Sequence, residues 1–402
     1  MTEELVERLG RAFALWTEGA PVLVGRDTRA SGPALERSLS SGLSAEGSPV
    51  TLGGVLPTPA VALLAPDGGA VVSASHNPPE YNGIKFFLDG WKLDDREQQE
   101  IESLVETTTT DGGGTAHSES PDLSQRYVDL VCERFGSPLK GFRVAADCAN
   151  GAMYEAAPTV FSCLGAHVVT VGNEPDGTNI NVGCGATDLS LLQEVVREDE
   201  FDLGVAFDGD GDRMLAVDAA GNELDGDQIL AVLALHLGVD VVAVTEMTNL
   251  GFHRLMEERG VRVLTTEVGD RYVAEALRRE GGVLGGEQSG HLIYLEGHTT
   301  GDGLVAALLL CRAVVESGRP LAELTAEMPK LPQAKTNVPV RSKEISPALR
   351  REIDNVATGG RVVVRPSGTE SVVRVLAEAE TDKEASSLCA RIAALVSREL
   401  GS

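Results

Sequence analysis

The sequence predicts an α/β protein of several domains, and three observations support this. Its 402 residues are too many for one ordinary hydrophobic core. Short, apolar, β-branched runs alternate with helical stretches whose apolar residues recur every three or four positions. Such alternation is typical of sheets that are covered by helices. Because these sheets bind ligands beyond the carboxyl ends of their strands, functional residues are expected there.

The pattern predicts individual elements along the whole chain. Helices are expected over 123–135, 189–196 and 227–237, and the last part should form strands within 361–377 and then an amphipathic helix over 382–400. The other predicted strands are 22–24, 70–72, 143–146, 167–171, 203–206, 241–244 and 262–264. Residues 107–120 are poor in apolar side chains and predict a solvated loop, and the proline-spaced residues 329–346 predict a linker.

Composition and charge exclude several classes of protein. The net charge of −27 argues against nucleic-acid binding, which needs a basic surface. No apolar run has membrane-spanning length and the first residues are acidic and amphipathic, so a cytoplasmic protein without a membrane partner is predicted. The six cysteines lack paired spacing, which argues against a zinc site or a disulfide framework. The acidic, lysine-poor composition suggests a high-salt (halophilic) cytosol, in which case the protein should work best with added salt.

The stretch GVAFDGDGDRMLAVD, residues 204–218, predicts a metal site. Asp208, Asp210 and Asp212 alternate with glycines directly after an apolar strand, so the three carboxylates can converge. Carboxylates at such short distances repel one another unless a divalent cation neutralises them, and their hard oxygen atoms suit Mg²⁺. An acidic hairpin turn is the alternative, and we favour the metal. Arg213 is either a charge partner of these acids or a phosphate ligand.

Two later stretches carry polar clusters. In VVVRPSGTESVVRV, Arg365, Ser367, Gly368 and Thr369 lie between two apolar strands, where they form either a phosphate cradle or an ordinary turn. The loop GGEQSGH presents the three side chains that could contact a sugar, although a satisfied polar turn explains it equally well. These are Glu287, Ser289 and His291.

The stretch VVSASHNPPEYNGIKFF, residues 71–87, predicts a reactive serine at the end of a strand, although a plain turn is possible. Ser75 would lie at the same sheet edge as the acids, and a serine that faces Mg²⁺ is suited to carry a phosphoryl group. His76 and Lys85 could move protons or orient phosphate. A Ser-His hydrolase is less favoured, because neighbouring residues on a strand point to opposite faces and G-x-S-x-G is absent.

Four stretches, SASHNP, DGDGDR, GEQSGH and RPSGTE, resemble the α-D-phosphohexomutase superfamily in the same order and over nearly the whole chain. DCANGAMYEAAP, VGDRYV and Gln288 are most similar to the branch that acts on glucosamine phosphates. The resemblance implies reversible interconversion of glucosamine 6-phosphate and glucosamine 1-phosphate, through a phosphoserine and a hexosamine bisphosphate that is both intermediate and activator. A phosphomannomutase/phosphoglucomutase of broad specificity and an inactive sugar-phosphate-binding protein are the alternatives.

The resemblance also implies an architecture: three α/β domains with mixed sheets and a smaller α+β C-terminal domain, around a central cleft. The corresponding ranges are 1–124, 125–227, 228–333 and 334–402. It implies a hexose(amine) phosphate as the bound small molecule and a monomer or homodimer. Mg²⁺ would be held by Ser75, Asp208, Asp210 and Asp212, with His76, Lys85 and Arg213 as further catalytic residues. Substrate would be bound by Glu287, Ser289, His291, Arg365, Ser367, Gly368 and Thr369.

The chain departs from the superfamily at its beginning. Members usually start with a strand that bears Phe-Gly-Thr and Ile-Arg-Gly motifs, whose arginine faces the active site, whereas this chain reaches GRDTR (25–29) without them. We therefore expect a first sheet that lacks one strand. A misassigned start, a trimmed chain, or compensation by Arg26 or Arg29 would account for the difference.

Overall fold

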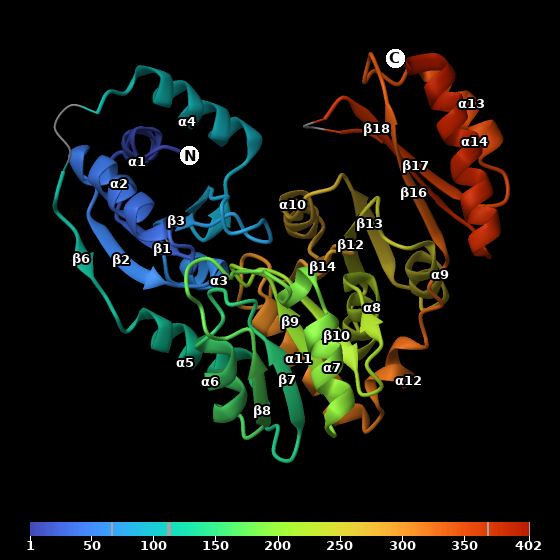
Figure 1. The fold of residues 1–402 in the computed structure, drawn as a ribbon, viewed down its shortest axis with the longest axis horizontal. Helices are drawn as coiled ribbons and strands as arrows, with labels where there is room; N and C mark the ends of the chain where they lie inside the picture. The colour runs from blue at the N-terminus through green and yellow to red at the C-terminus, as the bar shows by residue number, and fades with distance from the viewer. Residues whose placement is uncertain (66, 111–113, 368–369, 402) are drawn as a thin grey trace.

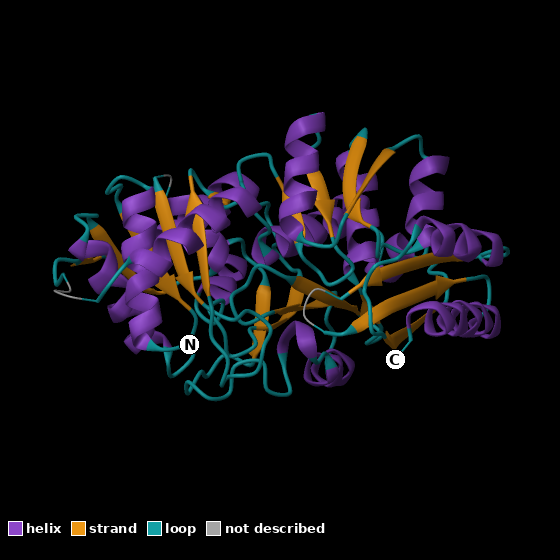
Figure 2. Cartoon of the chain, turned by 90° about the horizontal axis from the view of Figure 1, so that it is seen from above, coloured by secondary structure: helices purple, strands orange, loops and turns teal. Residues whose placement is uncertain are grey.

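The computed structural model describes residues 1–65, 67–110, 114–367 and 370–401. Its strands form four separate sheets of six, five, four and three strands, in chain order. Figure 1 shows the four corresponding domains as an arc from domain I at the upper left to domain IV at the upper right. Figure 2 shows the helices flanking the strands. The predicted architecture of three α/β domains and a smaller C-terminal α+β domain is confirmed.

Domain I contains a mixed sheet of strand order β5-β4-β3-β1-β2-β6. Strands β1, β2, β3 and β6 run parallel, whereas β4 is antiparallel to β3 and β5 is antiparallel to β4. The chain enters this domain through a helix, and its first strand lies inside the sheet. The elements are α1 Glu3–Trp16, β1 Val22–Arg26, α2 Gly32–Ala45, β2 Val50–Val55, α3 Thr58–Leu64, β3 Gly68–Val72, β4 Ile84–Leu88, β5 Trp91–Lys92, α4 Asp95–Thr107 and β6 Ser118–Glu119.

Domain II also contains a mixed sheet, with the strand order β11-β10-β9-β7-β8. Strands β7, β8 and β9 are parallel, and β9 turns back through an antiparallel hairpin into β10. The turn of that hairpin carries the acidic stretch of the sequence. The elements are α5 Leu123–Phe135, β7 Arg143–Asp147, α6 Ala156–Cys163, β8 His167–Val171, η1 Gly185–Thr187, α7 Ser190–Glu198, β9 Leu203–Phe207, β10 Met214–Asp218 and β11 Glu223–Leu224.

Domain III has the strand order β13-β12-β14-β15, with β15 antiparallel to β14. The loop between β14 and β15 contains the GEQSGH stretch. The elements are α8 Gly226–Leu237, β12 Val241–Thr245, α9 Leu250–Glu258, β13 Arg262–Thr266, α10 Asp270–Glu280, β14 Leu284–Gly286, β15 Leu292–Tyr294, α11 Gly303–Ser317 and α12 Leu321–Thr325.

Domain IV is an antiparallel sheet of order β16-β18-β17 that packs against two helices. The elements are β16 Gln333–Pro339, α13 Pro347–Val356, β17 Arg361–Pro366, β18 Val372–Glu378 and α14 Asp382–Leu400. Its apolar core is separate, whereas one continuous buried cluster runs through domains I, II and III and includes Val61, Phe161 and Leu308. The fourth domain is therefore joined to the rest mainly by polar contacts and by its chain connection.

Most of the predicted elements are confirmed, and the differences have physical reasons. The predicted linker at 329–346 contains β16, which pairs with β18 along its whole length. It is an edge strand, where proline is tolerated because one side of the strand needs no ladder hydrogen bond. Helix α13 was not predicted, and two residues of the predicted loop 107–120 pair with β2 as β6. Among the described helices, none is both long and apolar enough to cross a bilayer.

Asp147, at the end of β7, holds two loops of domain II. Its buried carboxylate accepts hydrogen bonds from the backbone N–H groups of Ala149 at 2.9 Å and Gly185 at 2.7 Å. Burial raises the pKa of Asp147 to about 6, although both hydrogen bonds oppose the shift. Because this pKa is higher in the folded chain than in the unfolded one, the free energy of unfolding falls as pH rises from about 4 to about 6.

We expect Asp147→Asn to remove this part of the pH dependence. Relative to wild type, the variant should gain about 2 kcal/mol of stability between pH 4 and pH 7, since one pKa unit corresponds to about 1.4 kcal/mol and part of the effect falls below pH 4. Replacing a carboxylate oxygen by an amide nitrogen also lowers the free energy of unfolding, by an amount that is the same at both pH values. Urea unfolding at the two pH values measures the difference, with the exposed Asp240→Asn as control. An equal offset at both pH values would contradict the assignment.

Candidate active site

The loop after β3 places Ser75 in an unusual backbone conformation. Ser75 has a φ of +52°, in the left-handed region, and its backbone N–H donates to Ser73 Oγ at 2.9 Å. Ser73 Oγ in turn donates to Asp27 at 2.6 Å. Because the strand has already ended, side chains no longer alternate, and His76 Nδ1 lies 3.4 Å from Ser75 Oγ. The expectation that these two side chains point to opposite faces is therefore wrong.

Arg29 holds the same loop through hydrogen bonds to its backbone. Its buried guanidinium pairs with Asp27 at 2.8 Å and donates to the carbonyl oxygens of Ser75 at 2.9 Å and Asn77 at 2.8 Å, and also to that of Pro78. Arg26 pairs with Glu36 at 3.2 Å. Arg29 thus shapes the serine loop through its backbone. The contacts of these two arginines do not favour either as a stand-in for the motif arginine that the chain lacks.

We expect Arg29→Met to be strongly destabilising. The substitution leaves the buried Asp27 carboxylate without its partner and the loop carbonyls without donors, and breaking such a pair typically costs about 3–5 kcal/mol. Urea or thermal unfolding measures the loss. Arg26→Met is the matched control, because its ion pair with Glu36 is more accessible to solvent and should cost less. Equal losses in the two variants would contradict the role given to Arg29.

The hairpin turn between β9 and β10 brings the three acids together. Asp208, Asp210 and Asp212 are all buried, and one carboxylate oxygen from each lies within 4.8 Å of the others. Ser75 Oγ donates to Asp208 Oδ2 at 2.5 Å, although 133 positions separate them. A Cβ atom on Gly209 would lie 2.7 Å from the Ser75 carbonyl oxygen, so glycine permits this close approach.

Cations and a hydroxyl fix the remaining acids. Lys85 Nζ donates to Asp210 Oδ2 at 2.6 Å and to Asp212 Oδ2 at 2.8 Å. Thr58, the first residue of α3, donates its hydroxyl to Asp210 Oδ2 and its backbone N–H to the Asp210 carbonyl oxygen at 2.9 Å. Thr58 was not predicted as a site residue. Its only local signal is the Pro-Thr-Pro stretch at the start of a helix, which carries no information about a partner in another domain.

The electrostatics of the turn suit a hard cation. Burial and the neighbouring Asp210 and Asp212 raise the pKa of Asp208 above its ordinary range. Burial has the same tendency at Asp212, but Lys85, His291 and Lys92 hold the pKa of that carboxyl well below its usual value. Asp210 Oδ1 is buried and has no hydrogen-bond partner among the described residues. The donor set, three clustered carboxylates with a free buried oxygen, therefore fits a divalent ion such as Mg²⁺.

Arg213 ends the acidic stretch, and Glu287 and Ser289 belong to the GEQSGH stretch. Arg213 donates its backbone N–H to Asp208 Oδ1 at 3.1 Å, and its buried Nε has no partner among the described atoms. Burial opposes the charge of Arg213, but Asp208 and Asp212 raise its pKa. Glu287 is buried and accepts from the backbone N–H of Gly269 at 3.0 Å, whereas Ser289 is exposed.

His291 lies against the acidic turn. Its Nδ1 is 3.5 Å from Asp212 Oδ1, and its Nε2 is 3.1 Å from Asp270 Oδ2. Burial disfavours a charged ring, yet Asp270 and Asp212 raise the pKa of His291 to about 9. Lys92 also contacts both of these acids. Neither Lys92 nor Asp270 was predicted as a site residue, because each belongs to a different domain from the acidic turn, and the VGDRYV stretch that contains Asp270 did not by itself indicate a role for that residue.

In domain IV, basic side chains gather around Arg365 and Ser367. A cavity of about 330 Å³ is lined by Lys335, Arg365 and Arg374, among others. Ser367 Oγ lies 3.4 Å from Arg374 Nη2, and the Nε atoms of both arginines are buried without hydrogen-bond partners among the described residues. Gly368 and Thr369 lie outside the described residues. Arg374 was not predicted, although it lies directly opposite Arg365 in the sheet register.

Gln288 links the GEQSGH loop to domain IV. Its Oε1 accepts from Lys335 Nζ at 3.0 Å, and its Nε2 lies 3.3 Å from both Asp227 Oδ2 and Gln333 Oε1. Both Lys335 and Gln333 belong to β16. The glutamine therefore connects the loop of domain III with the edge strand of the fourth domain.

A serine hydroxyl beside three buried carboxylates, together with a basic cavity on a fourth domain, is an arrangement for moving phosphoryl groups on a small anionic substrate. Carried on three α/β domains and a smaller C-terminal one, it defines the phosphohexomutase class of enzymes. Models of all four domains of phosphoglucomutase/phosphomannomutase match the chain: α/β/α domain I at 1–111, domain II at 125–221, domain III at 225–331 and the C-terminal domain at 319–395. The chain belongs to the phosphoglucomutase/phosphomannomutase family.

Relatives are similar over nearly the whole length. A phosphoglucosamine mutase of Desulforudis audaxviator is 49% identical, covering 95% of this chain and 91% of the relative. Another of Saccharopolyspora erythraea is 47% identical, covering 93% and 89%. The crystal structure of a phosphoglucomutase/phosphomannomutase family protein from Burkholderia thailandensis has a TM-score of 0.85 at 24% identity, covering 99% of this chain and 94% of that one. This last similarity concerns the fold alone.

Proposed function

We propose that the protein is a phosphoglucosamine mutase, which interconverts glucosamine 6-phosphate and glucosamine 1-phosphate. The observation that carries the proposal is the contact of 2.5 Å between Ser75 Oγ and Asp208 Oδ2 in the buried acidic turn. The names of the two bacterial relatives support the amino-sugar substrate. A cytoplasmic location and a monomeric or homodimeric state remain predictions.

In this proposal Ser75 carries a phosphoryl group between turnovers. A free hydroxyl of the sugar monophosphate attacks that phosphorus atom and loses its proton, the bond from phosphorus to Ser75 Oγ breaks, and Ser75 Oγ takes up a proton to become a hydroxyl again. The product is a hexosamine bisphosphate. After the bisphosphate has turned over, Ser75 Oγ attacks its other phosphoryl group and gives up a proton, which restores the phosphoserine and releases the isomeric monophosphate. His76 Nδ1, 3.4 Å from Ser75 Oγ, would accept and return this proton, because Asp208 is engaged as a metal ligand.

Asp208, Asp210 and Asp212, with an oxygen of the phosphorylated Ser75, would hold Mg²⁺, which neutralises charge on the transferring phosphoryl group when it is bound. Lys85 contributes a fixed positive charge, because Asp210 and Asp212 raise its pKa despite its burial. The buried guanidinium of Arg213 has an unpartnered Nε and would bind a phosphoryl oxygen. These residues thus compensate the negative charge that accumulates on phosphate.

The other end of the substrate would be held by the remaining predicted residues. Glu287, Ser289 and His291 belong to the loop that would contact sugar hydroxyls. Arg365 and Ser367, with Gly368 and Thr369, would bind the phosphate that does not react, and the unpartnered guanidinium nitrogens around the cavity in domain IV support an anion there. A single phosphate cradle that accepts either end of a bisphosphate would explain how the intermediate reorients.

Substrate comparison tests the proposal. Purified protein is assayed with Mg²⁺ and a trace of hexose bisphosphate on glucosamine, glucose and mannose 1-phosphates. The proposal expects the highest kcat/KM on the amino sugar. A strong preference for glucose or mannose would instead indicate a phosphomannomutase/phosphoglucomutase of broad specificity. Binding of all three without turnover would indicate an inactive sugar-phosphate-binding protein.

A further inference from the structure

We propose that Lys92 and Asp270 are positioning residues that orient Asp212 and His291 from outside the metal turn. Lys92 ends β5 of domain I, Asp270 begins α10 of domain III, and Asp212 belongs to the turn in domain II. The role in turnover rests on the proposed function, whereas the geometric role does not.

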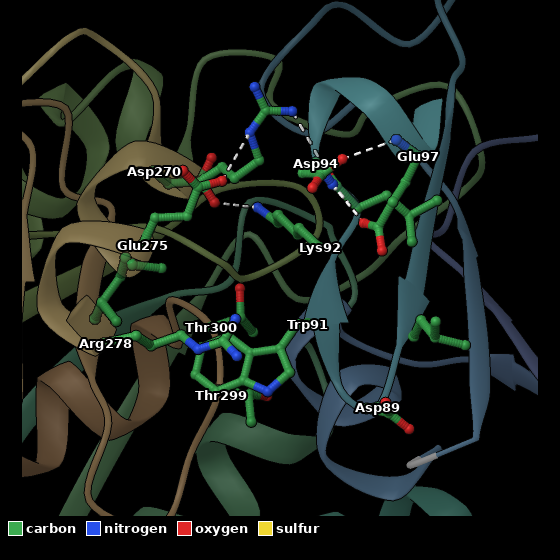
Figure 3. A pocket seen from close by; sticks show the side chains of 15 residues that line it. Asp89, Trp91, Lys92, Asp94, Glu97, Asp270, Glu275, Arg278, Thr299 and Thr300 are labelled. Atoms are coloured by element: carbon green, nitrogen blue, oxygen red, sulfur yellow. Dashed lines mark hydrogen bonds and ion pairs between the residues drawn. The ribbon is translucent and has the colours of Figure 1, made fainter. Parts of the chain in front are cut away.

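The four side chains form a closed ring of contacts. Lys92 Nζ contacts Asp270 Oδ2 and lies 3.5 Å from Asp212 Oδ2. His291 completes the ring, with Nε2 at 3.1 Å from Asp270 Oδ2 and Nδ1 at 3.5 Å from Asp212 Oδ1. Each acid therefore faces the same two basic side chains, and the ring crosses all three α/β domains. Figure 3 shows Lys92 and Asp270 in contact at the wall of a cavity between domains I and III.

The ring is well placed to fix the rotamer of Asp212. The side chains of Asp212 and His291 are each only 2% exposed, and those of Lys92 and Asp270 are 19% and 24% exposed. Lys85 and Lys92 occupy Asp212 Oδ2, whereas Oδ1 faces His291. Polar contacts are strong in such a poorly solvated place, and losing one member leaves its partners unpaired. In the described contacts Asp270 touches none of the three acids of the turn. It therefore acts on Asp212 through Lys92 and His291.

A matched ion pair crosses the same domain boundary without joining the ring. Arg271, the residue after Asp270, contacts Asp95 of α4 at 2.6 Å and the Leu93 carbonyl oxygen at 3.3 Å. In the described contacts neither Arg271 nor Asp95 touches the metal turn. If Lys92 and Asp270 merely held domains I and III together, breaking the pair of Arg271 and Asp95 would have the same consequence.

The experiment compares Lys92→Met and Asp270→Asn with the control Arg271→Gln. Two quantities are measured: Mg²⁺ affinity of the substrate-free protein by calorimetry, and kcat and KM on glucosamine 1-phosphate. Changing residues that orient metal ligands typically costs about 10- to 100-fold in metal affinity or activity. We expect losses of that size in Mg²⁺ affinity and in kcat for both variants, with KM nearly unchanged in Lys92→Met. The control should stay within about twofold of wild type, and Lys92→Arg should recover most of the loss.

The direction in which Lys92→Met changes the Mg²⁺ affinity distinguishes a role of Lys92 in orienting Asp212 from an effect of its charge alone. Removing a cation beside three carboxylates would by charge alone tighten Mg²⁺ binding. Weaker binding in Lys92→Met therefore supports orientation, whereas tighter binding, or losses equal to those of Arg271→Gln, would overturn the proposal. If Lys92→Met fails to fold, Lys92→Gln is measured by the same calorimetric criterion. A wild-type protein without mutase activity whose variants still show the Mg²⁺ pattern would refute the proposed function and leave this inference standing.

Discussion

Ser75→Ala should abolish turnover, lowering kcat by a factor on the order of a thousand or more, because alanine has no side-chain oxygen that could carry the phosphoryl group. The Ser75 hydroxyl lies 2.5 Å from Asp208, and its loop is fixed by Arg29 and Asn181 through the Ser75 carbonyl oxygen. Substrate binding should persist, since the basic side chains of domain IV are untouched. Steady-state assays with added bisphosphate measure the loss.

Intact-mass measurement gives an independent readout of the same variant. Wild-type protein treated with hexose bisphosphate should gain one phosphate on the peptide that contains Ser75, and Ser75→Ala should gain none. Ser31→Ala is the control, because this exposed serine belongs to the same domain and its hydroxyl contacts only the Asn82 side chain among the described side-chain contacts. Full activity in Ser75→Ala, or phosphate on another residue of the active wild-type protein, would refute the role of Ser75.

Asp210→Asn should lower kcat by roughly 10²- to 10³-fold, the size of effect seen when a key stabilising group is removed from an active site. Asp210 Oδ1 is buried without a hydrogen-bond partner among the described residues, whereas Oδ2 already accepts from Thr58 and Lys85. An amide would also turn a donor towards one of these partners or towards the ion. Mg²⁺ affinity, measured by calorimetry, should fall with kcat.

Removal of the metal by chelation provides a complementary test of the acidic turn. Wild-type protein treated with EDTA should lose turnover to a similar extent and regain it with added Mg²⁺, whereas Asp210→Asn should respond weakly to both. Glu223→Gln changes an exposed acid on the strand that follows the same hairpin and should behave as wild type. Activity that is unaffected by chelation would contradict a metal-dependent reaction.

The sequence predicted features that depend on local chemistry and on the direction of strands. Apolar runs such as 203–206 and 241–244 became buried strands because burial of a continuous apolar segment is a local property. The meeting of Ser75 with Asp208 was predicted because both follow strands, and the carboxyl ends of such strands gather ligands.

Contacts between domains could not be predicted in the same way. Thr58 and Lys92 contact the acidic turn from domain I, and Asp270 of domain III contacts Lys92 and His291 beside it; no spacing along the chain encodes how domains dock. The orientation of His76 was also missed, because strand alternation was assumed where the backbone had turned left-handed. Edge strand β16 was predicted as a linker, since Pro339 within it and the prolines just before it are compatible with both structures.

The positive φ of Ser75 has a consequence for which amino acids this position can accept during evolution. Serine and threonine often exchange freely where only a hydroxyl is needed, but threonine bears a second heavy atom on Cβ. A β-branched residue at φ +52° would be strained, by about 1–3 kcal/mol. Backbone shape therefore selects against threonine at residue 75 before any demand of the reaction is considered, and divergent descendants of this chain should keep the unbranched alcohol.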